Sequence, residues 1–286
     1  MLPIFLCTWL ALSPDGRTLW VAQEDQPRIV RFELPREAPA GSIRLSFVPS
    51  GLAVGAKGLY VAGETGVRLV NFTGHGEAPL TTGRGATSPV FSRDSRTLYV
   101  CNRFDNTVSI VDVARWQVLA TVRTCREPIA AALAPDGKRL FVACHLPDQP
   151  LTAEHVAARV CVIDTAGATV ERSITLPNGS TGVRGIALSA DGRYAFVTHL
   201  LARYTLHTTQ LEQGWMNTNA LTILDVPSQR VLATVLLDDV DDGAANPWAV
   251  GCTPDSRYVC VTHAGTHELS VILLPELLDK LRHEVE

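Results

Sequence analysis

The stretch Leu12-Ser-Pro-Asp-Gly-Arg-Thr-Leu-Trp-Val-Ala-Gln23 decides the fold, because the chain repeats its pattern six times. Each copy places a tight turn before a hydrophobic strand that ends in a small residue and a polar one. Pro presets φ, Asp caps the turn and Gly accepts a positive φ, so Pro-Asp-Gly predicts a turn with a known mechanism. The other copies are Leu52–Gly63, Phe91–Asn102, Leu133–His145, Leu188–His199 and Cys252–His263.

The repeat has a period typical of β-propeller blades. Its anchor residues are Asp15, Ala56 in a degenerate copy, Asp94, Asp136, Asp191 and Asp255, which are 38 to 64 residues apart. Strand-like units that recur at about 40 residues indicate a propeller, with one four-stranded meander in each unit. The sequence therefore predicts an all-β propeller with six blade motifs, whose units start near residues 9, 48, 88, 129, 183 and 246.

The end of the chain departs from the repeat. Residues 1–274 form the predicted propeller domain, and residues 275–286 read as a short amphipathic helix with Leu277, Leu278 and Leu281 on one face. The sixth unit therefore lacks a convincing fourth strand. Two arrangements stay open: six blades that close imperfectly, or an incomplete arc of a propeller with seven or more blades. We favour the arc.

The motif Tyr99-Val-Cys-Asn102, followed by Asn106-Thr-Val-Ser-Ile-Val-Asp112, resembles the repeat of YVTN-type β-propellers. The stretches 198–204, 213–219 and 243–250 also resemble a bacterial subgroup of that family. In this subgroup the propeller often accompanies a c-type cytochrome or a di-haem-peroxidase-like domain. The resemblance implies a periplasmic or extracellular protein. No Cys-x-x-Cys-His motif occurs in this chain, so we expect no covalently attached haem here.

Composition excludes several classes of function. The formal net charge is −4 and no Lys/Arg run occurs, so nucleic-acid binding is not expected. The apolar run from Met1 to Leu12 is too short to span a bilayer and has no positively charged start, so no signal peptide is visible. The seven cysteines show no Cys-x-x-Cys spacing, and we expect buried free thiols rather than zinc ligands.

The histidines give a sharper signal. Aligned at the end of the second strand, the units place Gln23, Gly63, Asn102, His145, His199 and His263 at one position. Neutral imidazoles from three successive blades suit copper, iron or zinc. A metal needs distances of about 2 Å to all its ligands, whereas adjacent blades lie about 10 Å apart. We favour the alternative that each His replaces the repeat Asn and forms hydrogen bonds within its own blade.

Two insertions lie near the same predicted face, at residues 200–218 and 238–246. Loops longer than about 12 residues are usually functional or disordered. Their aromatic and polar side chains complete a candidate face for a ligand or partner. The residues of this face are His145, His199, Arg203, Tyr204, Trp215, Asn217, Asn246, Trp248, His263 and His267.

Three functions remain open. The leading hypothesis is a non-catalytic recognition or docking module for a partner protein or a redox domain. The alternative is a metal-dependent or haem-linked oxidoreductase, or the propeller half of one, with His145, His199 and His263 as ligands. The third is a lactonase-like hydrolase, for which no acid/base set can be assigned residue by residue. Whether the chain is an enzyme stays undecided, because a fold alone does not establish chemistry.

Overall fold

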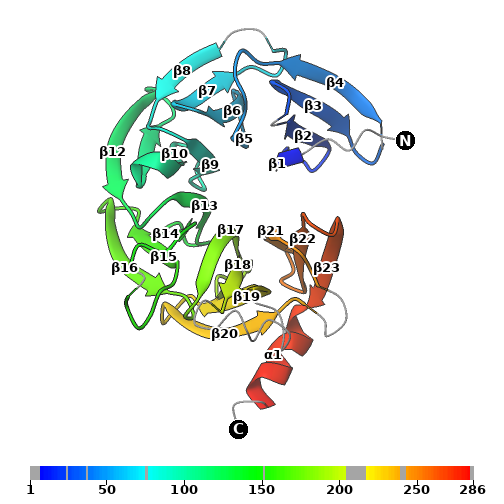
Figure 1. Cartoon of the computed structure of the whole chain (residues 1–286). Coiled ribbons are helices and arrows are strands. Elements are labelled where there is room, and N and C mark those ends of the chain that lie inside the picture. Colours follow the sequence, from blue (N-terminus) through cyan, green and yellow to red (C-terminus); the bar gives the residue numbers. More distant parts are fainter. Residues whose placement is uncertain are drawn as a thin grey trace. The chain divides into compact units, whose positions relative to one another are not determined.

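The computed structural model describes residues 7–23, 25–36, 38–74, 77–150, 152–203, 217–238 and 243–283. The chain divides into two compact units, Met1–Arg123 and Thr124–Glu286. Each described part consists of antiparallel sheets in which consecutive strands pair in sequence order (Figure 1).

The first unit holds three four-stranded sheets, which we call blades 1 to 3. A short 3-10 helix, Arg103–Asp105, connects the second and third strands of blade 3. The strands are β1 (Cys7–Leu12), β2 (Thr18–Gln23), β3 (Arg28–Glu33) and β4 (Pro39–Arg44) in blade 1, β5 (Gly51–Gly55), β6 (Gly58–Gly63), β7 (Gly66–Val70) and β8 (Glu77–Thr81) in blade 2, and β9 (Ala86–Phe91), β10 (Thr97–Asn102), β11 (Thr107–Asp112) and β12 (Gln117–Arg123) in blade 3.

The second unit holds blades 4 to 6 and one helix. Blades 4 and 5 have four strands, and blade 6 has three among the described residues. The elements are β13 (Pro128–Leu133), β14 (Arg139–Cys144), β15 (Arg159–Asp164) and β16 (Thr169–Thr175) in blade 4, β17 (Ser180–Leu188), β18 (Tyr194–Ala202), β19 (Asn217–Asp225) and β20 (Arg230–Leu236) in blade 5, β21 (Pro247–Cys252), β22 (Tyr258–His263) and β23 (Glu268–Leu273) in blade 6, and the helix α1 (Leu274–His283).

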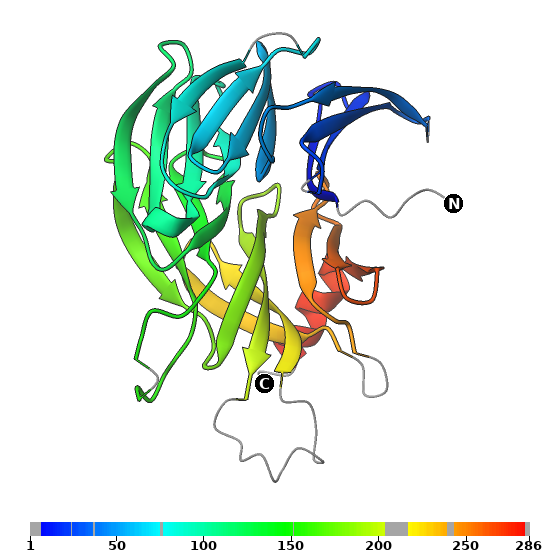
Figure 2. The same ribbon diagram turned by 45° about the horizontal axis from the view of Figure 1, so that its top comes forward.

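Within each unit the sheets pack face to face, with their first strands next to one another. Strand β5 contacts β1 and β9 in the first unit, and β17 contacts β13 and β21 in the second. Figure 2 shows the sheets of blades 4 and 5 side by side. Apolar residues lie on both faces of the strands, so each contact between blades buries a hydrophobic cluster. This arrangement of twisted meanders is that of β-propeller blades.

The turns form as the repeat predicts. Asp94 accepts a hydrogen bond from the Ser92 hydroxyl at 2.6 Å and another from the backbone N–H of Arg96 at 3.1 Å. Asp15, Asp191 and Asp255 each accept the equivalent pair of bonds. The side-chain hydrogen bond from Ser92 is the largest effect that lowers the pKa of Asp94. These bonds close each turn and fix the register of the first two strands.

The helix α1 begins directly after β23 and covers the apolar face shared by blades 5 and 6. Leu274 is buried, and Leu277, Leu278 and Leu281 pack against the same cluster, which includes Phe196 of β18 and Val259 of β22. The predicted helix with these leucines on one face is therefore confirmed. Its apolar stripe therefore packs on the hydrophobic cluster between blades 5 and 6.

The predicted fold class is confirmed: the described chain is all-β, with six propeller blades and one short C-terminal helix. The predicted domain bounds stay a prediction; the first strands of the six blades begin at Cys7, Gly51, Ala86, Pro128, Ser180 and Pro247. None of the helices in the described ranges is long and apolar enough to cross a membrane. The incomplete arc stays a prediction, because it concerns the placement of the two units rather than the blades within each.

Candidate functional site

One position recurs in every blade at the end of the second strand. It lies eight residues after each Asp anchor and seven after Ala56 of the degenerate copy, and its side chain shares a sheet face with the residue two positions before it. Cross-strand pairing fixes the register, because Val100, Val142, Val197 and Val261 pair with Ser109, Cys161, Thr222 and Ser270 on the third strands. The second-strand position is therefore occupied by Asn102, Cys144, His199 and His263 in blades 3 to 6.

In blade 3 this position forms a closed polar network. The Asn102 amide donates to the Ser109 hydroxyl at 2.9 Å and to the Thr107 hydroxyl at 3.0 Å. The Thr82 hydroxyl, from the segment before β9, donates to Oδ1 of Asn102 at 2.9 Å. Asn102 is completely buried, and these bonds replace the water that its amide loses.

In blade 5 His199 takes the same place. Its Nε2 lies 2.7 Å from Oγ1 of Thr222, and its Nδ1 lies 3.1 Å from the carbonyl oxygen of Leu200. The side chain is completely buried. Burial lowers the pKa of His199 to about 4, so the ring is neutral at pH 7.

In blade 6 His263 is equally buried but only half satisfied. Its Nε2 lies 2.8 Å from Oγ of Ser270, the third-strand residue at the equivalent position. Its Nδ1 is buried without a hydrogen-bond partner, as is the Thr266 hydroxyl in the turn that follows. His263 thus repeats the cross-strand bond of Asn102 and leaves one imidazole nitrogen unpaired.

The expectation that His145 shares this position is wrong by one residue. Asp136 and Cys144 are eight residues apart, as are Asp94 and Asn102, so Cys144 occupies the repeat position. His145 follows the last residue of β14 and lies outside the strand. Its Nδ1 lies 2.7 Å from the carbonyl oxygen of Val183, the backbone N–H of which donates to His145 O at 3.1 Å. His145 therefore connects blade 4 to blade 5.

The other predicted residues of the candidate face lie at several places in the second unit. Trp248 at the start of β21 stacks under the Arg184 guanidinium, 4.2 Å from its ring centre. The backbone N–H of Asn246 donates to Asn219 Oδ1 at 3.1 Å. Arg203 and Asn217 are exposed at the ends of β18 and β19, and His267 is exposed in the turn before β23. Tyr204 and Trp215 lie outside the described residues.

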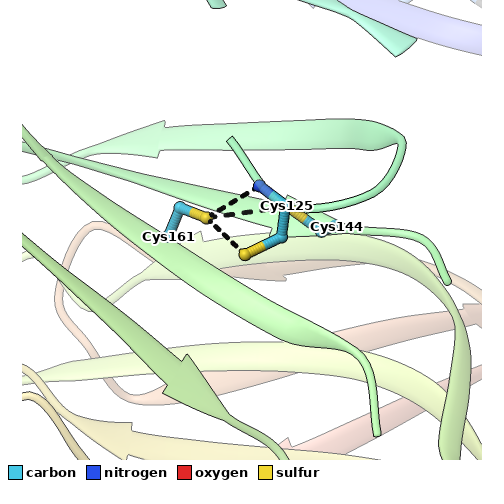
Figure 3. A group of neighbouring side chains, drawn as sticks. All are labelled: Cys125, Cys144 and Cys161. Atoms are coloured by element: carbon cyan, nitrogen blue, oxygen red, sulfur yellow. Dashed lines mark hydrogen bonds between the residues drawn. The ribbon is translucent and has the colours of Figure 1, made fainter. Parts of the chain in front are cut away.

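A group of three cysteines in blade 4 was not expected from the sequence. Among the described residues, Cys125, Cys144 and Cys161 are the only His, Cys, Asp or Glu side chains that gather in a group of three or more with all ligand atoms within 4.8 Å. Sγ of Cys161 lies 3.1 Å from Sγ of Cys125 and 3.9 Å from Sγ of Cys144. Figure 3 shows the three side chains converging from β14, β15 and the segment before β13. The three histidines form no such group, and a metal bound by them stays a prediction.

The thiols of this group share hydrogen bonds. Those from Cys144 and Cys161 lower the pKa of the Cys125 thiol. The same bonds to Cys125, together with burial, raise the pKa of Cys144 and of Cys161. Cys144 and Cys161 are buried and Cys125 is half-buried, with the Ser173 hydroxyl 3.3 Å from its sulfur. Cys125 is the most accessible of the three sulfurs.

Comparison with known proteins finds relatives that match parts of the chain. No family model matches the chain, so the resemblance to YVTN-type propellers stays a prediction. The chain is 25% identical to hydrazine synthase subunit beta of Kuenenia stuttgartiensis over 183 residues, which are 63% of this chain and 45% of that protein. It is 31% identical over 108 residues to antigen Lp49 of Leptospira interrogans, covering 36% of this chain and 23% of the antigen. The matches thus span less than half the length of these relatives.

Solved structures show the same fold. Kuenenia stuttgartiensis hydrazine synthase superposes with a TM-score of 0.87 and 24% identity, covering 96% of this chain and 79% of that one. The Cps50 (Swd1) β-propeller domain of Myceliophteria thermophila superposes with a TM-score of 0.68 and 14% identity, covering 93% and 83% of the two chains. These similarities establish the propeller fold.

One signal in the sequence could have found the cysteine group. Cys144 and Cys161 occupy the positions of Asn102 and Ser109, so the polar pair of blade 3 becomes a thiol pair in blade 4. Cys125 corresponds in role to Thr82, since both precede a first strand and contact that pair. A comparison of blades by strand register, rather than by spacing between cysteines, reveals all three.

Proposed function

We propose that this chain is a non-catalytic propeller module that docks a partner protein and acts as a subunit of a larger assembly. The similarity to a protein named as a subunit of hydrazine synthase supports this role. The buried, hydrogen-bonded state of His199 also supports it, because a ring held between β18 and β19 contributes to the stability of its blade. The observation that carries the proposal is an apolar sheet face on blade 6 that no described element of the second unit covers.

Blade 6 has one covered face and one open face. Val259 and Val261 of β22 point into the cluster shared with blade 5 and α1. Leu269 and Val271 of β23 point to the opposite face of the sheet, and each of these residues is 58% exposed. Cys260 pairs with Val271 and is half-buried on the same open face. We call Leu269, Val271 and Cys260 the open face of blade 6.

The first unit has a comparable surface on blade 1. Leu10 and Leu12 of β1 are 63% and 51% exposed, while Trp9 and Ala11 pack towards blade 2. The open side bears an apolar groove of about 300 Å³. Its lining residues are Leu10, Leu19, Val21, Phe32, Leu34, Pro35 and Arg36.

Blade 5 shows what covers such a face elsewhere in the second unit. In blade 5, Val197 packs against blade 4 while Phe196 packs against blade 6, so both faces meet the apolar face of another sheet. Sheets that pack in this way lie about 10 Å apart and interdigitate their side chains. The expected occupant of the open face of blade 6 is therefore an apolar β-sheet face, and we propose that a partner protein supplies it.

Site-specific crosslinking tests the proposal. A photo-reactive amino acid at position 271 is expected to crosslink one partner in the source cells, at residues on an apolar sheet face. The matched control carries the same group at position 232, where Leu232 of β20 is also exposed, at 49%. The double variant Leu269→Asp/Val271→Asp is expected to abolish the interaction, and Leu232→Asp to preserve it. Identical crosslinking patterns from positions 271 and 232 would overturn the proposal.

A further inference from the structure

Blade 4 differs from blade 3 in the chemical groups that occupy one equivalent position in the two sheets. In blade 3, Thr82, Asn102 and Ser109 form a network of hydroxyl and amide groups. In blade 4, all three roles fall to cysteines, Cys125, Cys144 and Cys161. A single buried thiol commonly acts as a small hydrophobic side chain. In blade 4, three thiols together replace the hydroxyl and amide groups of blade 3. This replacement points instead to a ligand that prefers sulfur.

Two of the three sulfurs already have the spacing that a single ion requires. A metal–sulfur bond of about 2.3 Å places the sulfurs of a trigonal or tetrahedral site about 3.8–4.0 Å apart. Sγ of Cys144 and Sγ of Cys161 already lie 3.9 Å apart. Sγ of Cys125 lies 3.1 Å from Sγ of Cys161, closer than an ion would place it. Cys125 lies in the segment before β13 rather than in a strand, so its side chain can move outward by the small distance required.

The surroundings suit a negatively charged complex. Two of the sulfurs are buried on adjacent strands, where the register of β14 and β15 fixes their positions. The positive charge of Arg159, at the start of β15, acts on the Cys125 sulfur. Cys125 is half-buried and provides the route by which an ion enters.

We propose that Cys125, Cys144 and Cys161 form a three-thiolate site for a soft d10 cation, and that Cu(I) is its ligand. Thiolates select Cu(I) and zinc among the biological metals. Structural zinc almost always takes four protein ligands. No fourth His, Cys, Asp or Glu of the described residues joins this group. Three thiolates without a fourth ligand therefore favour Cu(I) over Zn(II).

Metal titration of the untagged, fully reduced chain tests the site. With Cu(I) added under anaerobic conditions against a chromophoric Cu(I) chelator, we expect one equivalent to bind per chain. X-ray absorption of the loaded protein is expected to show three sulfur neighbours at about 2.3 Å or slightly less. A parallel titration with Zn(II) is expected to show weaker binding. Tighter binding of Zn(II) with a fourth oxygen or nitrogen neighbour would overturn the assignment to Cu(I).

Variants show whether these cysteines hold the ion. Loss of an outer-shell partner alone lowers metal affinity by about 10–100-fold, so Cys125→Ser and Cys161→Ser are expected to lower Cu(I) affinity by at least about 100-fold. Cys252→Ser is the matched control, because Cys252 is half-buried and lies in β21 of blade 6. Circular dichroism and thermal melting check that each variant folds, and the accessible position of Cys125 makes Cys125→Ser the variant least disturbing to the blade.

Two results would overturn the site itself. One is Cu(I) binding that Cys125→Ser and Cys252→Ser change equally. The other is a Cys125–Cys161 disulfide that persists in excess reductant, found as a linked peptide pair by mass spectrometry. Such a bond would bring the two sulfurs to about 2.05 Å and leave Cys144 as the only remaining thiol of the group.

Discussion

Nε2 of His199 and Oγ1 of Thr222 lie 2.7 Å apart between β18 and β19, and both side chains are completely buried. The carbonyl oxygen of Leu200 can only accept, so Nδ1 of His199 carries the proton and Nε2 accepts from the Thr222 hydroxyl. Oγ1 of Thr222 in turn lies 2.7 Å from Oγ1 of Thr234 in β20. One chain of hydrogen bonds thus links three strands of blade 5 and requires a neutral imidazole.

These hydrogen bonds to a neutral His199 predict that the stability of the protein depends on pH. Burial lowers the pKa of His199 to about 4 in the folded protein, while an unfolded histidine titrates near its ordinary value of 6.5. Between these values the unfolded state binds more protons, so the free energy of unfolding rises with pH. The contribution is fully present above about pH 6.5 and is lost as pH falls towards about 4, with a total of about 3 kcal/mol.

Urea unfolding at several pH values measures this contribution. His199→Asn introduces the residue that blade 3 uses at this position and removes the titrating group. The difference in unfolding free energy between the original protein and His199→Asn is expected to decrease from pH 7 to pH 4. The control is His267→Asn, since His267 is exposed in a turn. Equal pH slopes for the original protein and His199→Asn would show that the ring is not held neutral.

The fold was predictable because each blade is built from consecutive residues. The anchor turns, such as Ser92 to Arg96, specify hairpins locally, and the period then gives the number of blades. The candidate site was harder to predict from the sequence, for two physical reasons. The sequence alignment placed His145 with Asn102 at the end of the second strand. The strand register gives this position to Cys144 instead, because Cys144 and Asn102 each pair with the first residue of their first strand. Cys125 and Cys161 are 36 residues apart, and only the pairing of strands brings their sulfurs to 3.1 Å.

The open face of blade 6 illustrates another limit of the sequence. Strands β18 and β22 both carry apolar residues on each face, so the two read alike. Whether a face is covered depends on the neighbouring sheet, which alternation within one strand does not reveal. The exposure of Leu269 and Val271 therefore became visible only in the three-dimensional arrangement of the second unit.

Two glycines of the second unit predict different effects of alanine. Gly179 has a φ of +89°, and a Cβ there would lie 2.2 Å from the carbonyl oxygen of Ala202. Gly137 has a φ of +73°, but nothing lies within 4 Å of its Cβ position. Gly137→Ala introduces left-handed strain alone, about 1 kcal/mol. Gly179→Ala adds a clash with backbone and is expected to lower stability by about 2–4 kcal/mol more.

Chemical denaturation of both glycine variants checks this difference. The hydrogen bond from Ala202 N to Gly179 O, at 2.8 Å, holds the backbone in place, so the carbonyl cannot retreat without disturbing the β17–β18 pairing. Gly137→Ala serves as the matched control for backbone strain. Equal losses of stability in the two variants would mean that the hairpin adjusts freely around residue 179.

Two leucines near the end of the chain separate a structural role from a docking role. Leu274, at the start of α1, is 3% exposed and packs with Phe196 and Val259, whereas Leu269 in β23 is 58% exposed. Leu274→Ala is expected to lower the free energy of unfolding by about 2–5 kcal/mol through lost burial and a residual cavity. Leu269→Ala is expected to change it by no more than about 0.5 kcal/mol, because the residue has little packing to lose. Thermal and urea unfolding measure both effects; a large loss of stability for Leu269→Ala would show that its face is already covered within the isolated chain.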